Sequence, residues 1–154
     1  MQINTDALVA VVLAFIALFA LLEQPAFAED AGATSASLYE RLGSWDGIEQ
    51  IVKDTIANHQ KNPAISHYFA DVDTSTLAGH VTAFFAAGTG GPSKYEGRDM
   101  TTTHADMGLS GADFDSAVAD VLRALDQNGI GEAEKVEVSA ILESLRPAVM
   151  GTGG

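Results

Sequence analysis

The sequence predicts an all-α fold built as a single domain. Apolar residues after residue 37 recur at helical spacing, and no segment alternates between apolar and polar residues as a strand does. Gly, Pro and Asn separate the periodic segments. The chain has 154 residues, of which 47% are hydrophobic, so it can bury a core and is not expected to be disordered.

Residues 1–28 differ from the rest and are predicted to be an export signal. Residues 7–22 are an unbroken apolar run that would be roughly 24 Å long as a helix, short of the ~30 Å hydrocarbon core of a bilayer. Ala26-Phe27-Ala28 follows with the small-x-small pattern of a cleavage site. We therefore expect cleavage near Ala28 and an exported protein in the periplasm or another extracytoplasmic space.

One feature favours the alternative, an uncleaved helix that anchors the protein to the inner membrane. Residues 1–6 contain no Lys or Arg, whereas an export signal usually begins with positive charge. In that case the protein would contact the membrane only through residues 7–22. In both cases residues 29–37 form a small, polar linker, and residues 38–150 form the folded domain.

The first long helix of the domain is predicted to begin near Asp46, which can cap it, and to end at Asn62-Pro63. A histidine shares its apolar face, which consists of Ile48, Ile51, Val52, Ile56 and His59. A short apolar corner, residues 67–69, follows. Asp73 or Thr74 caps the second helix. Its stripe has the spacing i, i+3, i+4, i+7, i+8 and consists of Leu77, His80, Val81, Phe84 and Phe85.

The helical pattern then breaks in a glycine-rich loop over residues 88–99, which is long for a compact helical domain. Loops of this length are often functional or wrap a ligand. A short helix is expected over residues 100–105, and it carries His104.

Two further helices close the chain, separated by Gly129 and Gly131. The second is predicted to run from about Glu132 to Leu145 and to end before Pro147. The first has one apolar face, which consists of Phe114, Ala117, Val118, Val121, Leu122 and Leu125. The folded domain is therefore expected to be a bundle of about four substantial helices plus short ones.

Composition excludes several classes of function. The net charge of −13 and pI of about 4.4 argue against nucleic acid as a partner, because phosphate backbones repel such a chain. The absence of cysteine excludes disulfides, iron–sulfur clusters, thiolate metal sites and haem attached through cysteine. No two histidines stand at the i, i+4 spacing of a zinc helix, and no G-x-S-x-G nucleophile elbow occurs.

His80 and His104 are the candidate ligands for a cofactor. Taken alone, each is more often an ordinary histidine than a ligand. Together they lie on different helices joined by a long loop, and they could face each other across a flat cofactor such as haem. Haem needs an imidazole for its iron, apolar walls, and cationic or hydroxyl groups at its propionate edge. Lys94, Tyr95 and Arg98 lie just before His104 and could serve the propionates.

From Ser37 to about Pro147 the chain resembles the truncated globins of the first group. The opening residues 38–43 and the corner at residues 67–73 are similar to the corresponding parts of that family. The family's first glycine pair is Gly43-Ser44 here, a small departure. The most specific match consists of Phe84-Phe85, Gly90-Gly91-Pro92, Tyr95, Gly97-Arg98, Met100 and His104-Ala105.

The resemblance implies a two-over-two arrangement of helices around haem b. His104 falls on the proximal iron ligand, and Phe69 on the phenylalanine that packs against the haem face. Tyr95 and Arg98 fall near the propionates, and Phe85 falls on a residue that lines a gas tunnel. The other residues expected to contact the cofactor are Leu77, His80, Val81 and Met100.

The distal side, where a gas binds, departs from the family. Related proteins commonly have a tyrosine in place of Ile56, and glutamines near Leu77 and Val81. All three positions are apolar here, and the loss of a hydrogen bond worth about 1–3 kcal/mol would release oxygen roughly ten- to a hundredfold faster. Thr55 and His59 share the face of Ile56 and could add polarity, although ordinary packing is the simpler interpretation. The expected distal pocket consists of Thr55, Ile56, Leu77, Val81 and Phe85.

His80 is the obvious distal donor that is left, and three interpretations of it stay open. It ligates the iron as a sixth ligand, contacts a propionate, or hydrogen-bonds a bound gas. Some members of the family close such a histidine onto the iron as a sixth ligand. Ligation and propionate contact are favoured about equally, ahead of a hydrogen bond to the gas.

The resemblance implies a haem protein that reversibly binds a diatomic gas, oxygen or nitric oxide, with carbon monoxide as a further ligand. Its role would be oxygen carriage or nitric oxide detoxification with an unidentified reductase, although the apolar distal pocket weakens the case for an enzyme. The alternative is a redox or electron-transfer protein in which His80 and His104 both ligate iron. A helical interaction module without haem is the third hypothesis.

Overall fold

The fold is seen in a computed structural model that describes residues 36–151. The predicted export signal or anchor, residues 1–28, lies outside the described residues, as do residues 29–35 of the predicted linker. None of the helices between residues 36 and 151 is long and apolar enough to cross a membrane.

The described part of the chain is helical and contains no strand, as the sequence predicts. Four helices are long, and the others are short segments between them. In chain order the elements are α2 (Leu38–Arg41), α3 (Ser44–Lys61), the 3-10 helix η1 (Ser66–Phe69), α4 (Thr74–Gly88), α5 (Met100–His104), α6 (Gly111–Gln127) and α7 (Glu132–Met150).

A sharp turn joins α2 to α3. Gly43 and Ser44 have φ angles of 89° and 58°, in the left-handed region that favours glycine. Ser44, which replaces the second glycine of the family's first glycine pair, therefore adopts a backbone conformation that favours glycine. Because the turn leads directly into α3, that helix begins two residues before Asp46, which lies in its first turn instead of capping it.

Most other predicted boundaries are confirmed. Asp73 caps α4, since its carboxylate accepts hydrogen bonds from the backbone N–H groups of Ser75 and Thr76. The glycine-rich loop separates α4 from α5, and Asp99 caps α5 by accepting a hydrogen bond from the N–H of Thr102.

The predicted end of the last helix is wrong, because α7 continues through Pro147 to Met150. Proline lacks the N–H that would bond to a carbonyl one turn earlier, so packing must hold this turn. Leu145 and Val149 are half-buried on the two sides of the proline and line the same cavity. Arg146 pairs with Asp115 of α6, which ties this end of α7 to its neighbour.

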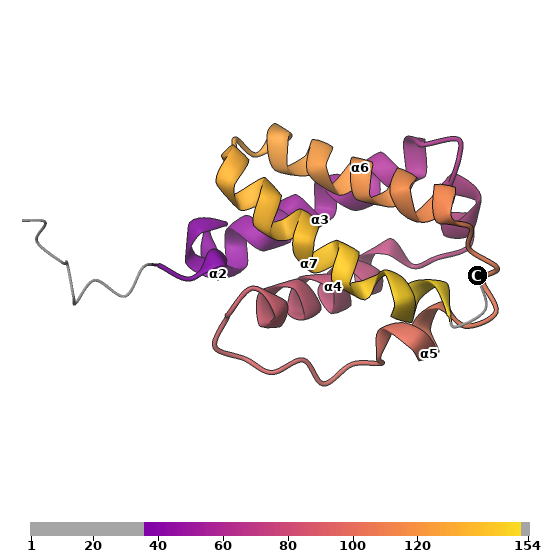
Figure 1. The fold of residues 1–154 in the computed structure, drawn as a ribbon, viewed down its shortest axis with the longest axis horizontal. Helices are drawn as coiled ribbons and strands as arrows, with labels where there is room; N and C mark the ends of the chain where they lie inside the picture. The colour runs from indigo at the N-terminus through magenta and orange to yellow at the C-terminus, as the bar shows by residue number, and fades with distance from the viewer. Residues whose placement is uncertain (1–35, 152–154) are drawn as a thin grey trace, which may run out of the picture. The chain divides into compact units, whose positions relative to one another are not determined.

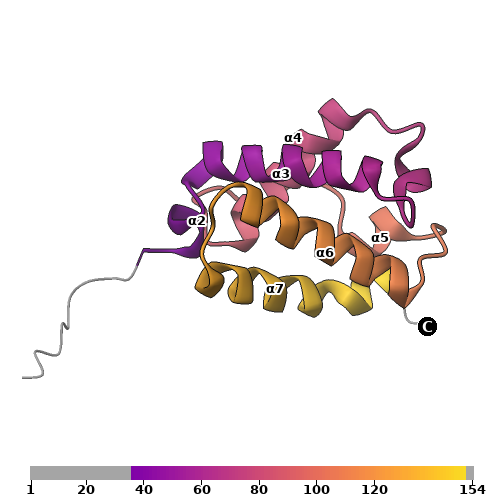
Figure 2. The ribbon, with the colours of Figure 1, turned by 90° about the horizontal axis from the view of Figure 1, so that it is seen from above.

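The four long helices form two pairs, α3 with α4 and α6 with α7, and the two pairs pack over each other. α3 packs against α4 and α6, and α7 packs against α6 and α5 (Figure 1). Figure 2 shows α3, α6 and α7 following one another across the domain, with α4 and α5 behind them. This is the two-over-two arrangement that the resemblance implies.

The hydrophobic core lies along α3. Ile48 and Ile51 of this helix are at most 1% exposed, as are Leu125 of α6 and Val138 of α7. Since these residues come from three different helices, the core holds the two pairs together and leaves one side of α3 free for a cavity.

Candidate functional site

A cavity of about 290 Å³ lies between the two helix pairs. It is close to the lower end of the range of roughly 300–1,000 Å³ found for cofactor sites, and most of its lining is apolar. Five helices and the loop before α5 contribute to it. The lining residues that carry nitrogen or oxygen in their side chains are Thr55, His59, His80, Tyr95, Thr103 and His104.

A second cavity, of about 150 Å³, adjoins the first on the side of η1 and the start of α6. Phe69, expected to pack against the cofactor, lines this second cavity and not the larger one. The two cavities have five lining residues in common, so they are neighbouring parts of one hollow. These residues are His59, His104, Phe114, Ala117 and Val149.

His104 is presented to this hollow with one ring nitrogen free. Its Nδ1 lies 2.8 Å from the backbone oxygen of Met100. A carbonyl oxygen can only accept a hydrogen bond, so Nδ1 carries the proton and Nε2 keeps its lone pair. A histidine that ligates a metal is oriented in this way by a hydrogen bond from its other nitrogen. The residues present therefore fit a haem held through Nε2 of His104.

His80 lines the same cavity from α4, but its side chain is exposed and makes no hydrogen bond to any residue between 36 and 151. Leu77 and Val81, on the same helix, line the cavity beside it. The structure thus brings both candidate histidines to one cavity, but it orients only His104 through a hydrogen bond.

Most of the other predicted site residues also line the larger cavity: Thr55, Phe85, Tyr95 and Met100. Ile56 lines neither cavity and belongs to the hydrophobic core. Its neighbour Thr55 faces the cavity instead. Arg98 lies outside the lining and donates a hydrogen bond to the carbonyl oxygen of Thr102, 3.1 Å away.

The loop before α5 has two basic side chains that form no ion pair within the described chain, although the net charge of the loop is zero. Five of the eight basic side chains form ion pairs. Lys94 and Arg98 make no ion pair with any residue between 36 and 151, although acidic residues are in large excess. Tyr95 lies between these two residues in the sequence, and its side chain lines the cavity. The loop therefore has two cations available near the cavity for a carboxylate.

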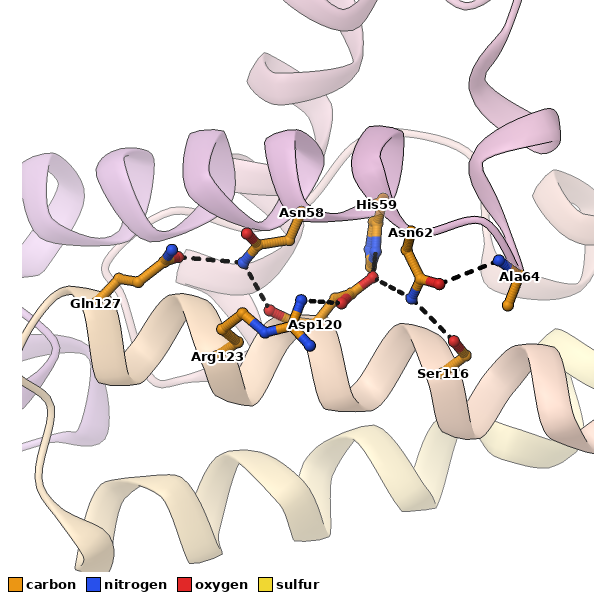
Figure 3. Close-up of polar contacts among 8 residues, drawn as sticks. All are labelled: Asn58, His59, Asn62, Ala64, Ser116, Asp120, Arg123 and Gln127. Carbon is orange, nitrogen blue, oxygen red and sulfur yellow. Dashed lines mark hydrogen bonds and ion pairs between the residues drawn. The ribbon is translucent and has the colours of Figure 1, made fainter.

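Sequence reasoning missed a buried polar cluster between α3 and α6, which we call the Asp120 cluster (Figure 3). Asp120 is completely buried. Its Oδ2 accepts hydrogen bonds from Nδ1 of His59, 3.1 Å away, and from the amide of Asn62, 2.8 Å away. Its Oδ1 accepts one from Arg123 at 3.1 Å. The cluster consists of Asn58, His59, Asn62, Ser116, Asp120, Arg123 and Gln127.

His59 connects the Asp120 cluster to the hollow, because it lines both cavities and stacks on Phe69 with ring centroids 5.2 Å apart. Burial disfavours the charged imidazolium and lowers the pKa of His59 below its usual range, while the hydrogen bond to Asp120 opposes this shift without cancelling it. Asp120 lies outside the apolar stripe that the sequence predicts for its helix, so helical periodicity carries no signal for the cluster.

The two-over-two arrangement of helices, with His104 presenting a free nitrogen to an apolar hollow, is the fold of a globin. The model of the bacterial-like globin family matches residues 37–150. The chain belongs to this family, and within it to the group 1 truncated haemoglobins. Membership of the globin family implies that the chain binds haem.

Comparisons with individual proteins agree with this assignment. The group 1 truncated haemoglobin GlbN of Synechocystis sp. is 34% identical over 110 residues, which are 69% of this chain and 89% of that protein. The truncated haemoglobin of Tetrahymena pyriformis in its Fe(III) form superposes with a TM-score of 0.73 at 25% identity, over 76% of this chain and 100% of that one. For THB1 of Chlamydomonas reinhardtii the TM-score is 0.65 at 30% identity, over 77% and 100%.

The burial of His59 predicts a pH dependence of stability. Because its pKa is lowered in the folded protein, the unfolded chain binds more protons between that pKa and the ordinary value of 6.5. The free energy of unfolding should therefore fall as the pH drops through 6.5. Urea titrations followed by circular dichroism between pH 7.5 and 5.5 should give a flatter profile for His59→Gln than for the wild type. His67→Gln, which changes an exposed histidine, is the control, and a wild-type slope in His59→Gln would contradict the prediction.

Proposed function

We propose that the domain holds haem b through Nε2 of His104 and reversibly binds a diatomic gas, oxygen or nitric oxide, at the haem iron. The observation that carries this proposal is the hydrogen bond from Nδ1 of His104 to Met100, which leaves a lone pair free in an apolar hollow. The ferrous iron of the bound haem supplies the gas-binding chemistry.

The protein itself supplies orientation, exclusion of water and charge. Leu77, Val81 and Phe85 give the hollow apolar walls, which keep water from a bound gas. Lys94 and Arg98 neutralise the propionates, which a chain with a net charge of −13 would otherwise repel.

Oxygen carriage and nitric oxide detoxification are the two roles that fit this site, the second with a reductase of unknown identity. No tyrosine or glutamine stands among the residues that line the larger cavity from α3 and α4. Bound oxygen would therefore lack the hydrogen bond that a tyrosine or glutamine gives it, which favours carriage over an enzyme that must hold oxygen until it reacts.

A redox or electron-transfer protein with two histidines on iron is the second candidate function. It is supported by the position of His80, which lines the same cavity as His104 and has no hydrogen bond within residues 36–151 to hold it away. In this form the iron would have no free position for a gas until His80 leaves it.

We further propose that the protein is exported and cleaved near Ala28, with an inner-membrane anchor through residues 7–22 as the alternative. The support is the apolar run of residues 7–22 and the Ala26-Phe27-Ala28 pattern after it. A reductase partner would then have to act outside the cytoplasm.

His104→Ala should abolish haem binding, because the hollow loses its nitrogen ligand. The purified variant is expected to lack the Soret band, as measured by optical absorption after expression in haem-replete cells. His67→Ala is the matched control, since His67 is exposed and lies outside both cavities. A Soret band of wild-type intensity in His104→Ala would rule out the proposed ligand.

The spectra of the ferric and dithionite-reduced protein, with and without carbon monoxide, should separate the two candidate functions. The gas-binding proposal predicts a five-coordinate ferrous state that takes up carbon monoxide quickly. The two-histidine alternative predicts a six-coordinate low-spin spectrum in both oxidation states. Only in the second case should His80→Ala change the spectrum of the ligand-free protein.

Export should leave a mature protein that begins at Glu29. Intact-mass spectrometry of the protein made from the full gene and recovered from the periplasm is the measurement. Recovery of a chain that still begins at Met1 in the membrane fraction would favour the anchor instead.

A further inference from the structure

Three histidines line the larger cavity, and they differ in how they are held. His104 is turned by Met100 so that its free nitrogen is available to iron. His80 is exposed, and no residue between 36 and 151 orients it through a hydrogen bond. His59 is only 9% exposed and is held by a buried carboxylate, that of Asp120. A ring that is buried, oriented and in contact with the cavity calls for an explanation beyond packing.

The geometry of His59 and Asp120 is that of an oriented base. A carboxylate oxygen accepts hydrogen bonds, so Nδ1 of His59 donates to Oδ2 of Asp120 over 3.1 Å, and Nε2 keeps its lone pair (Figure 3). Asn62 and Arg123 donate to the same carboxylate and keep it in place. A base oriented by a third group in this way is the arrangement that general-base chemistry uses.

The cavity creates a need for such a base. Its lining is mostly apolar and the chain carries a net charge of −13, so anions are disfavoured both by desolvation and by repulsion. A weak acid, HX, can enter as a neutral molecule. To bind at a cationic metal centre as X⁻, it must then give up its proton inside the cavity.

We propose that His59 accepts this proton, and that the site therefore takes up weak acids of the class of hydrogen sulfide, hydrogen peroxide and hydrogen cyanide. In this step the H–X bond breaks, both of its electrons stay with X, and the proton passes to Nε2 of His59. Nothing is oxidised or reduced. The proposal rests on the proposed haem site, because X⁻ binds at the ferric iron.

Asp120 is a positioning residue in this step. It fixes the ring through Nδ1, and its negative charge stabilises the imidazolium that forms. Before a ligand arrives, the lowered pKa of His59 keeps its ring neutral and ready to accept a proton at pH 7. The titratable or charged groups that face His59 or share its cavities come from η1, α4, the loop, α5 and α6, and they are Tyr68, His80, Tyr95, His104, Asp113, Asp120 and Arg123.

The test uses the ferric haem protein with cyanide as the probe, because hydrogen cyanide is almost entirely protonated at pH 7. Proton release is followed with an indicator dye in weak buffer, and the binding rate by stopped-flow absorption. The wild type should release almost no proton, because the negative charge of bound cyanide raises the proton affinity of His59, which then retains the proton. His59→Gln keeps a hydrogen-bonding side chain but no base, so it should release about one proton per haem. It should bind about a hundredfold more slowly, at the lower end of what a positioned base contributes.

Further variants test whether the effect is specific to His59 and Asp120. His67→Gln, which changes an exposed histidine outside both cavities, should match the wild type in both measurements, and His80→Gln should still retain the proton whatever its binding rate. Asp120→Asn keeps the His59 ring but removes the charge beside it, so release should lie between zero and one proton and binding should be slower. This variant also stands in if His59→Gln does not fold, as checked by circular dichroism and the Soret band.

The proposal is overturned if His59→Gln or Asp120→Asn retains the proton and binds at the wild-type rate. It is also overturned if His80→Gln is the variant that releases the proton. Failure of the proposed haem site would look different, because the wild type would then show no Soret band and bind no cyanide.

Discussion

The structure depends on the burial of α3 on two sides at once. Its 18 residues pack against α4 on one side and α6 on another, and its isoleucines Ile48 and Ile51 are removed from solvent. Both walls of the cavity are therefore attached to one helix, which sets the spacing between them.

The same hydrogen-bonding arrangement occurs twice around this hollow. In His104 and in His59, Nδ1 donates to a fixed oxygen and Nε2 is left with a lone pair. The acceptor of the hydrogen bond differs between the two histidines, and so does the role that we infer for each. A neutral carbonyl orients His104 for a metal, whereas the buried carboxylate of Asp120 orients His59 and favours a proton on it.

Helical periodicity predicted the number, order and approximate length of the long helices, because packing of apolar stripes decides them. It could not predict which neighbouring residue faces the hollow, since each step along a helix turns the side chain by about 100°. The structure consequently puts Thr55 on the cavity and Ile56 in the core. His59 and Asp120, which are hydrogen-bonded in the structure, lie 61 positions apart in the sequence. A local sequence pattern does not encode a contact at that separation.

Pro147 gives the hollow a weak point. The turn of α7 around it lacks one backbone hydrogen bond, and Leu145 and Val149 on its two sides belong to the cavity wall. Local unfolding starts where the fewest interactions must break, and the end of a helix frays before its middle. The last turn of α7 is thus a part of the wall with few interactions to break, and the ion pair of Arg146 with Asp115 holds it against α6. We therefore expect this turn to open when a cofactor enters the folded apoprotein.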